Sequence, residues 1–305
     1  MVRVLPYGSW ASPITAGSLV AGAVGLAEVV VDGRDVWWAE GRPEEGGRTV
    51  VGRRSPDGTV ADMIPSDVDV RTGVHEYGGG AWWVANGVLI HSDRSHERLV
   101  RRMPDGGSVL LTPKPDAPRA LRYADGRTTP DGRWYVCVRE AHPVDPAGGE
   151  PATELVAVAT DGSMRVDVVT TGADFVAWPR ISPDGTRLAW VRWNHPNLPW
   201  DDTELWVADL VADTEGCTLS NARCVAAGGE SFFQPEWRSD GVLHVVTDRG
   251  DWWHVHRVDP DTGDLEALTG GQAEVDTPQL ESRLARYAFD GAVKRDLPRV
   301  DGVRC

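Results

Sequence analysis

The chain has 305 residues, of which 41% are hydrophobic and 25% are charged, and it contains 14 tryptophans. This composition supplies enough apolar surface for a sizeable core and excludes a disordered chain. The formal net charge of −15 excludes the concentrated basic surface that nucleic-acid binding requires, so no nucleic-acid partner is expected.

The start of the chain and its cysteines predict a cytoplasmic protein. The opening MVRVLPYGSWASP lacks the basic and then apolar run of a secretory signal. No stretch approaches the ~18 apolar residues of a membrane span, so no membrane partner is expected. The cysteines form no CxxC pair, which favours reduced thiols; they are Cys137, Cys217, Cys224 and Cys305. A bridge between Cys217 and Cys224 stays open, because their spacing neither demands nor forbids it.

An N-terminal segment (residues 1–27), with a weak helical period after Ala16, precedes a series of strand-like runs. Asp-Gly turns recur ahead of similar runs: Gly132 precedes RWYVCVRE, Gly185 precedes TRLAWVRW and Gly241 precedes VLHVVTDR. Each is followed by a second strand-like run, and Asp-Gly suits tight hairpins because glycine tolerates positive φ. The chain therefore repeats a hairpin unit, which indicates a repeat architecture.

These repeats predict an all-β fold, a β-propeller of four-stranded antiparallel blades. Runs such as LAWVRW are apolar on both faces, as expected of sheets that neighbouring blades cover on both sides, with tryptophans between them. The propeller domain is expected over residues 28–271, with five to six blades, the last incomplete. Residues 272–305 are a degenerate last blade or tail.

The blade boundaries follow from the turns. Five blades are expected over residues 28–65, 76–113, 122–172, 174–229 and 231–270, and a sixth begins near Gln272 and loses the pattern. Residues 143–151 and 213–224 are rich in Gly, Pro, Asp or Thr and are expected to be loop insertions.

Several segments together resemble the N-terminal propeller of the prolyl oligopeptidase family, in its acylaminoacyl-peptidase or dipeptidyl-aminopeptidase-like branch. They are YGSWASPIT (7–15), VHEYGGGAWW (74–83), ADFVAWPRISPDG (173–185), HPNLPWDDTELWVADL (195–210) and FQPEWRSDG (233–241). The resemblance runs from about Pro6 to Gly270. It implies a propeller that covers the active site of an α/β-hydrolase domain holding Ser, Asp and His, and that restricts entry to peptides and small acyl or aminoacyl substrates.

The chain departs from that family in its catalytic half. No serine lies in the G-x-S-x-G motif that presents a nucleophile above a hydrolase sheet, because residues 106–110 and 229–233 both lack the closing glycine. No strands alternate with long helices. We therefore expect no catalytic residue in this chain, which reads as a truncated serine peptidase, inactive as a hydrolase by itself. An incomplete ring also leaves unpaired strand edges, so self-association through an open blade edge is expected.

Substrate contacts, if the hydrolase half is present, are predicted at His75, Glu76, His195 and Trp200. His75 and Glu76 precede three glycines that permit close backbone approach. The resemblance places this loop toward the centre of the propeller, where Glu76 would hold the amino end of a substrate by charge pairing. A hydrogen-bonded turn carboxylate is the alternative. His195 and Trp200 lie in the HPNLPWDD loop, which is expected to join two strands of one blade and to form a scaffold or pocket wall.

Other polar residues fit structural roles, so no metal and no cofactor is expected. His254 and His256 lie on one face of a predicted strand and could ligate zinc, but no third ligand is evident. Asp201 and Asp202 resemble an acid–base pair, yet aspartates in such loops commonly cap turns. Residues 259–264 (DPDTGD) contain acidic side chains that could ligate calcium, but they lack the spacing of a dedicated calcium-binding loop.

Three functional hypotheses result. The first is the substrate-gating propeller of a prolyl-oligopeptidase-like serine peptidase without its catalytic domain. The second is a stand-alone propeller that serves as a binding or interaction module. The third, and least favoured, is a metal-dependent propeller lactonase, which would require carboxylates that converge on a metal ion.

Overall fold

The computed structural model describes residues 6, 8, 9, 12–15, 17, 18, 22–145, 148–272, 288–290 and 293–295. The chain divides into two compact units, Met1–Asp69 and Val70–Cys305. The predicted fold class is confirmed: the structure is an all-β propeller with five sheets of four antiparallel strands. No helix among the described residues is long and apolar enough to cross a membrane.

The first unit contains one blade. Its strands pair in the order β1-β2-β3-β4, and a turn of 3-10 helix, η1 (Pro43–Glu45), leads from the second strand to the third. The strands are β1 (Gly25–Asp32), β2 (Asp35–Arg42), β3 (Arg48–Arg54) and β4 (Val60–Asp62). The sheet begins at Gly25, so the last residues of the segment with the weak helical period are strand and not helix.

The second unit contains four blades and a short hairpin. Each blade is an antiparallel meander in which consecutive strands are neighbours. The first two blades are β5 (Trp82–Ala85), β6 (Val88–Asp93), β7 (Arg98–Arg102) and β8 (Ser108–Leu110), then β9 (Leu121–Thr128), β10 (Trp134–Ala141), β11 (Ala152–Ala159) and β12 (Val166–Thr170).

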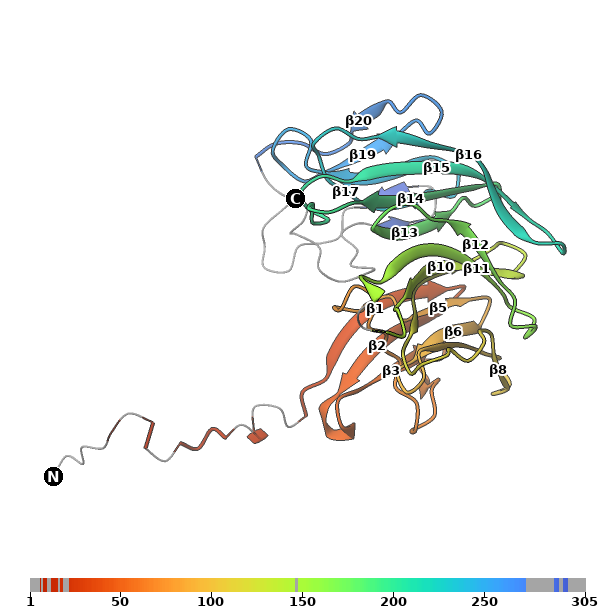
Figure 1. The fold of residues 1–305 in the computed structure, drawn as a ribbon. Coiled ribbons are helices and arrows are strands. Elements are labelled where there is room, and N and C mark those ends of the chain that lie inside the picture. The colour runs from red at the N-terminus through yellow and green to blue at the C-terminus, as the bar shows by residue number, and fades with distance from the viewer. Residues whose placement is uncertain are drawn as a thin grey trace. The chain divides into compact units, whose positions relative to one another are not determined.

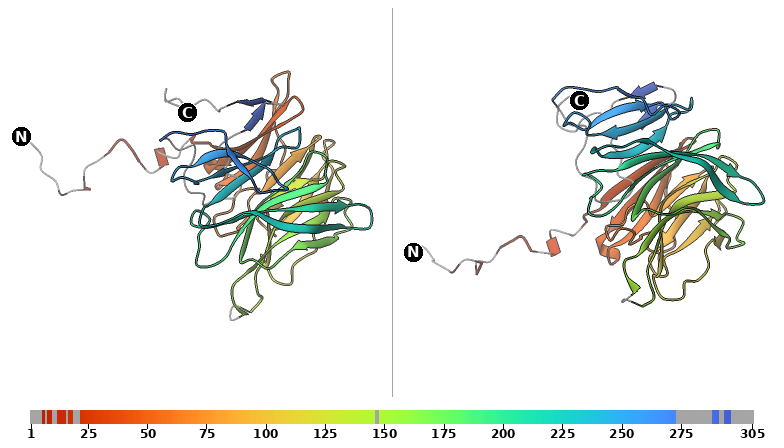
Figure 2. Two further views of the ribbon diagram at one scale, coloured as in Figure 1. Left: turned by 90° about the horizontal axis from the view of Figure 1, so that it is seen from above. Right: turned by 45° about the horizontal axis from the view of Figure 1, so that its top comes forward.

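The next two blades follow the same course. They are β13 (Phe175–Ile181), β14 (Arg187–Trp193), β15 (Glu204–Ala212) and β16 (Cys217–Ala226), then β17 (Phe232–Trp237), β18 (Leu243–Thr247), β19 (His254–Val258) and β20 (Leu265–Ala267). The sheets β9–β12, β13–β16 and β17–β20 stack face to face like vanes (Figures 1 and 2). The first strands β5, β9, β13 and β17 lie next to one another in that order. The short hairpin is β21 (Ala288–Asp290) with β22 (Val293–Arg295).

The repeated Asp-Gly turns close the hairpins by one local mechanism. In each, an aspartate carboxylate accepts the backbone N–H two residues later, as Asp131 does from Arg133 (3.1 Å) and Asp184 from Thr186 (3.1 Å). The glycine between them adopts positive φ, 72° at Gly132. Such Asx turns need only residues that are neighbours in sequence, which explains why they mark the blades so clearly.

Apolar clusters fill each interface between consecutive blades of the second unit. Ile90 and Tyr135 belong to the cluster between the β5–β8 and β9–β12 sheets, and Trp134 and Trp190 to the next one. A third cluster, which includes Trp193, joins β13–β16 to β17–β20. A blade is thus covered on both faces because its neighbours bury them.

Two expectations about segments between strands have different outcomes. Residues 143–151 do connect two strands, since β10 ends at Ala141 and β11 begins at Ala152. The expectation of a loop over residues 213–224 is wrong for most of that span, because β16 begins at Cys217 and extends a long hairpin with β15. Its many small and polar residues are the exposed side of an edge strand. The predicted sixth blade lies outside the described residues, apart from the β21–β22 hairpin.

Candidate functional site

A cavity of about 610 Å³ in the second unit brings together all four residues that were predicted to contact substrate. His75 and Glu76 lie on one wall of the cavity, and His195 and Trp200 come from the loop between β14 and β15. Its volume falls within the range of roughly 300–1,000 Å³ that is usual for small-molecule sites. The HPNLPWDD loop therefore does join two strands of one blade and does form a cavity wall.

The turn that carries His75 and Glu76 has an unusual backbone. Both residues have positive φ, 52° and 64°, which costs energy for residues with a side chain. The next three glycines continue the left-handed path; a Cβ on Gly78 would lie 2.7 Å from the carbonyl oxygen of Thr72, and one on Gly80 2.8 Å from the backbone nitrogen of Asp125. The glycines are therefore required for the close approach that turns Glu76 toward the cavity.

Glu76 presents an ionised carboxylate to the cavity. The Arg122 guanidinium donates a hydrogen bond from Nη1 to Oε1 of Glu76 (2.9 Å) and lowers the pKa of that carboxyl. The same Nη1 also donates to the carbonyl oxygen of Gly73 (2.6 Å), which anchors the turn. The Glu76 side chain is nonetheless 76% exposed, so the carboxylate keeps acceptor positions for a ligand.

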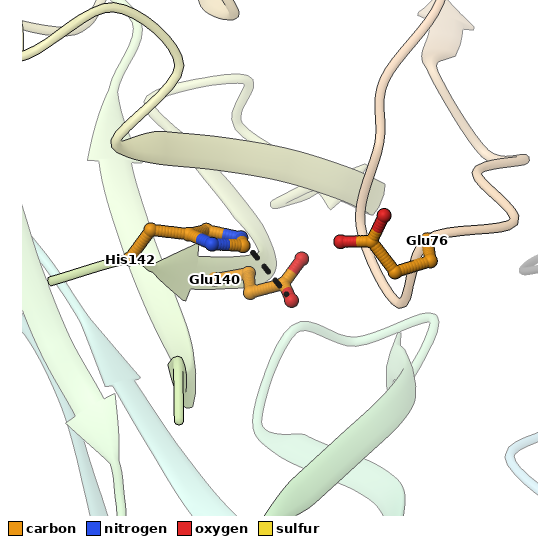
Figure 3. A group of neighbouring side chains, drawn as sticks. All are labelled: Glu76, Glu140 and His142. Atoms are coloured by element: carbon orange, nitrogen blue, oxygen red, sulfur yellow. Dashed lines mark ion pairs between the residues drawn. The ribbon is translucent and has the colours of Figure 1, made fainter. Parts of the chain in front are cut away.

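Glu140 lies behind Glu76 and is buried, with its side chain 7% exposed. Its Oε2 accepts the backbone N–H of His75 (3.1 Å), so it holds the strained turn in place. Its other oxygen lies 3.4 Å from Nε2 of His142 (Figure 3). Burial raises the pKa of Glu140, and the interactions of its carboxyl with His142 and Arg122 oppose that shift.

Glu76, Glu140 and His142 form a group whose candidate ligand atoms all lie within 4.8 Å of one another, a spacing that could hold a metal ion. The Arg122 guanidinium, however, lies 2.9 Å from Glu76 and 3.9 Å from Glu140. It already supplies the positive charge that a metal would bring, and its hydrogen bond occupies one of the oxygens. Arg122 would therefore compete with a metal ion for this group, which forms an ion-pair cluster in the structure.

Aromatic rings also line the cavity. Phe175 and Trp193 face each other as register partners of β13 and β14 and stack with their ring centroids 5.2 Å apart and an interplanar angle of 12°. His75 packs edge-on against both rings, at 5.6 and 5.7 Å, and His195 packs edge-on against Phe175 at 5.0 Å. Burial lowers the pKa of His75 to about 4, so its imidazole is neutral at physiological pH.

The loop between β14 and β15 is held by polar contacts from three blades. The backbone N–H of His195 donates to Asp174 (2.9 Å), and its ring Nε2 lies 2.9 Å from the carboxylate of Glu150. Ser231 from the following blade donates its hydroxyl to the carbonyl oxygen of Pro199 (2.5 Å). The wall that carries Trp200 is thus supported from several sides.

The remaining polar candidates have structural partners. Asp201 accepts the backbone N–H of Leu198 and Asp202 that of Gly229, as capping aspartates do. His254 and His256 are both buried; Nε2 of His254 lies 3.2 Å from the carbonyl oxygen of Gly271. In residues 259–264, the first aspartate accepts hydrogen bonds from two backbone N–H groups of its own turn.

The cysteines are not bridged among the described residues. Cys137, Cys217 and Cys224 are free thiols, so the disulfide between Cys217 and Cys224 that the sequence left open is not formed.

The sequence did not single out several residues of the site, among them Glu140, Phe175 and Trp193. Glu140 ends a strand of one blade and reads there as an ordinary exposed glutamate, while Phe175 and Trp193 read as core. A local signal did exist for the aromatic pair, because Phe175 begins a strand and Trp193 ends the next one, so the hairpin must bring them together. No local signal relates Glu140 to a turn 65 positions earlier in the chain.

Known proteins support these observations. A family model described as the lipoprotein LpqB β-propeller domain matches residues 144–288. A puromycin-hydrolysing peptidase from Mycobacterium tuberculosis has a similar structure, with 36% identity and a TM-score of 0.82; the match covers 94% of this chain and 45% of that chain. A puromycin hydrolase matches with 34% identity and a TM-score of 0.84 over the same shares.

Other similarities are weaker. An oligogalacturonate lyase in complex with manganese, at 15% identity and a TM-score of 0.58 over 79% of this chain and 63% of that one, shares the fold alone. Among the curated proteins, none matches this sequence. This chain spans less than half the length of the puromycin-hydrolysing enzymes, and the part that matches is their propeller.

Proposed function

We propose that this chain, whose structural neighbours are the N-terminal β-propellers of puromycin-hydrolysing peptidases of the prolyl oligopeptidase family, selects substrates for a serine peptidase of that type. Its cavity binds the amino end of a peptide or a small aminoacyl compound. Bond cleavage is assigned to an α/β-hydrolase domain and not to the residues of this propeller. The propeller gates access to that domain.

The observation that carries the proposal is the environment of Glu76. A substrate ammonium needs a carboxylate that is ionised, reachable and held in place. Glu76 is ionised because Arg122 lowers its pKa, reachable because its side chain is 76% exposed, and held because the glycine turn and Glu140 fix its backbone. A charge-assisted hydrogen bond from the ammonium to this carboxylate then orients the ligand in the cavity.

Binding of a tripeptide with a free or a blocked amino end tests this function. Isothermal titration calorimetry on the 305-residue chain compares Phe-Gly-Gly with N-acetyl-Phe-Gly-Gly. We expect acetylation and Glu76→Gln each to weaken binding about tenfold, the loss of one charge-assisted hydrogen bond. Glu266→Gln, which changes an exposed glutamate of β20 paired with Arg257, is the matched control and should bind as the unchanged chain does. Equal affinity for both peptides would refute the proposal.

The two alternatives make different demands on the same cavity. A stand-alone binding module would use it without a hydrolase domain, and it would show the same dependence on Glu76. A metal-dependent lactonase would need the Glu76, Glu140 and His142 group to hold an ion, and Arg122 opposes that by charge and by position. The geometry therefore favours a ligand with an amino group.

A further inference from the structure

We infer that a second cavity of the second unit binds a small ligand that carries one carboxylate on an apolar body. This cavity has a volume of about 600 Å³ and shares no lining residue with the cavity of Glu76. We call it the arginine cavity, because Arg101, Arg127 and Arg180 line it. The site is separate from that of the proposed function, since it consists of other residues and takes another kind of ligand.

The two cavities lie at opposite ends of strand β13. Phe175 begins β13 and lines the cavity of Glu76, whereas Arg180, near the end of the strand, lines the arginine cavity. Residues of the turns that follow β9 and β13, 129–132 and 182–183, also line it. Its volume falls within the range of roughly 300–1,000 Å³ that is usual for small-molecule sites.

Two of the three arginines are balanced by carboxylates of the protein. Arg180 pairs with Asp125 at 3.0 Å and with Glu236 at 2.7 Å. Arg127 lies 3.4 Å from the same aspartate and 3.7 Å from the same glutamate. This group of two guanidinium ions and two carboxylates has no net charge. It can therefore position hydrogen-bond donors, but the charge that attracts an anion has to come from elsewhere.

Arg101 supplies that charge. It lies on β7 and is half-buried, and among the described residues no carboxylate pairs with it and its Nε makes no hydrogen bond. Asp161 attracts it electrostatically, but that carboxylate accepts the backbone N–H of Ser163 instead (2.8 Å). The other lining carboxylate, Asp131, lies 3.5 Å from Arg133. One positive charge is left, which matches a ligand with one negative charge.

The other two guanidinium groups are held in place before a ligand arrives. Nε of Arg180 donates to Glu236 (2.7 Å) and its Nη1 to Asp125 (3.0 Å), which leaves Nη2 without a hydrogen bond to any described residue. The Arg180 side chain is 3% exposed. The Arg127 guanidinium stacks over the ring of Trp83, 3.9 Å from the centroid. Donors fixed in this way lose little freedom when they bind a carboxylate.

The apolar part of the lining leads to Arg101. Trp83 on β5 pairs with Ile90 on β6, and Ile90 pairs with Arg101 on β7. Residues that pair directly across adjacent strands point to the same face of the sheet, so these three side chains form one row. Met103 and Trp237 add apolar surface to the lining. A ligand whose apolar body follows this row brings its carboxylate to the unpaired guanidinium.

Binding of 4-phenylbutyrate and of its amide tests this site. Isothermal titration calorimetry on the 305-residue chain compares the acid, which has one carboxylate on an apolar body, with 4-phenylbutyramide, which has the same body without the charge. We expect the acid to bind about tenfold more tightly, the value of one charge-assisted hydrogen-bonded pair. The preference should shrink as the concentration of sodium chloride rises.

A carboxylate can belong to a free acid or to the C-terminus of a peptide, and a second pair of probes distinguishes these sources. N-acetyl-Gly-Gly-Phe has a C-terminal carboxylate and no ammonium, and its C-terminal amide has neither charge. A preference for the peptide acid over its amide assigns the site to peptide ends as well. A preference in the 4-phenylbutyrate pair alone assigns it to free acids. No preference in either pair overturns the inference.

Variants of the lining locate the carboxylate. Arg101→Gln should weaken binding of 4-phenylbutyrate about tenfold and leave that of the amide unchanged, whereas Arg101→Lys, which keeps the charge without the planar fork, should recover part of the loss. Met103→Gln should weaken the acid and the amide equally, about twofold, because it changes only the apolar wall. Arg257→Gln, a strand arginine outside the lining that pairs with Glu266, is the matched control. Far-UV circular dichroism confirms that each variant is folded, and an unchanged preference in Arg101→Gln would refute the site.

Competition separates the arginine cavity from the cavity of Glu76. Phe-Gly-Gly amide has an ammonium and no carboxylate, so it should not displace 4-phenylbutyrate, and Glu76→Gln should not change the affinity for the acid. Displacement would place 4-phenylbutyrate in the cavity of Glu76 and overturn the inference, while the proposed function stands. If acetylation does not weaken Phe-Gly-Gly amide but Arg101→Gln still removes the preference for the acid, the proposed function fails and the arginine cavity stands.

Discussion

Arg180 and Asp125 form an ion pair between the first strands of two neighbouring blades, β13 and β9, with Nη1 and Oδ1 3.0 Å apart. Their side chains are 3% and 1% exposed. Nε of Arg180 also donates to Glu236 on β17, at 2.7 Å, so one guanidinium ties together three blades. Burial alone would lower the pKa of Arg180, yet the two carboxylates hold that pKa above its ordinary value.

Loss of Arg180 should therefore destabilise the propeller strongly. Arg180→Met leaves the buried Asp125 with only Arg127, 3.4 Å away, as counter-charge among the described residues. Breaking a buried pair in this way costs about 3–5 kcal/mol. Urea unfolding followed by tryptophan fluorescence measures the loss. Arg238→Met is the matched control, because Arg238 forms an exposed pair with Asp240, and it should leave the urea midpoint unchanged. Equal midpoints for the two variants would contradict the structural role of Arg180.

Gly126, at the bulge of β9, should tolerate no side chain. A Cβ at this position would overlap the ring of Tyr135 on the paired strand, and both residues lie in the sheet interior. Gly126→Ala should lower the free energy of unfolding by about 3 kcal/mol, as overpacking of a core does. Gly132→Ala is the comparison, since a Cβ there meets no atom within 4 Å and only its φ of +72° is unfavourable. It should cost about 1–2 kcal/mol, and a reversed order would show that the overlap is relieved by movement of Tyr135.

The thiols should differ sharply in reactivity. Burial raises the pKa of Cys137 and raises that of Cys217 to about 12, whereas Cys224 is exposed on β16. The thiolate is the reactive form, so iodoacetamide at neutral pH should label Cys224 first in the folded protein. Mass-spectrometric mapping of the labelled peptides compares these three sites, and unfolding in urea is the control that should expose all of them. Early labelling of Cys137 would contradict its place in the core.

Glu140 should make the protein less stable as the pH rises. Burial raises its pKa above the ordinary 4.5, so the folded state holds this proton more tightly than the unfolded state. The favourable contribution is complete below pH 4.5 and is lost as the pH rises through the folded-state pKa. Relative to Glu140→Gln, the unchanged chain should therefore lose free energy of unfolding as the pH rises from 4.5 through the folded-state pKa. Chemical denaturation at a series of pH values measures this difference, and a flat difference would refute it.

Asp184 should have the opposite dependence. Its carboxylate accepts hydrogen bonds from the Ser182 hydroxyl and from the backbone and hydroxyl of Thr186, and these lower its pKa. Its contribution is present above pH 3.8 and is lost as the pH falls through the lower folded-state value. The unchanged chain should thus lose its advantage over Asp184→Ala on acidification. The same denaturation series tests this, and a growing advantage at low pH would contradict it.

The repeat of turns and strands was predictable because it depends only on residues that are neighbours in the sequence. Each of the five predicted blade spans corresponds to one four-stranded sheet, although the first sheet begins at Gly25 instead of residue 28 and the third at Leu121 instead of residue 122. An Asp-Gly turn needs only a carboxylate, a glycine and the N–H two residues on, and apolar runs between such turns predict covered strands. The motifs of the HEYGGG and HPNLPWDD segments were likewise sufficient to select His75, Glu76, His195 and Trp200 as candidates, which share one cavity.

The sequence by itself thus determined that the blades are four-stranded antiparallel sheets and that the described residues contain five of them. It also identified the two loops that line the cavity. Only the tertiary structure decided that Glu140 supports the turn of Glu76, that Arg122 lies between them, and that Arg180 joins three blades. Such contacts join residues 46 to 65 positions apart in the chain. They depend on how whole blades pack and on bulges that change the direction of a strand. Neither feature produces a pattern among neighbouring residues in the sequence.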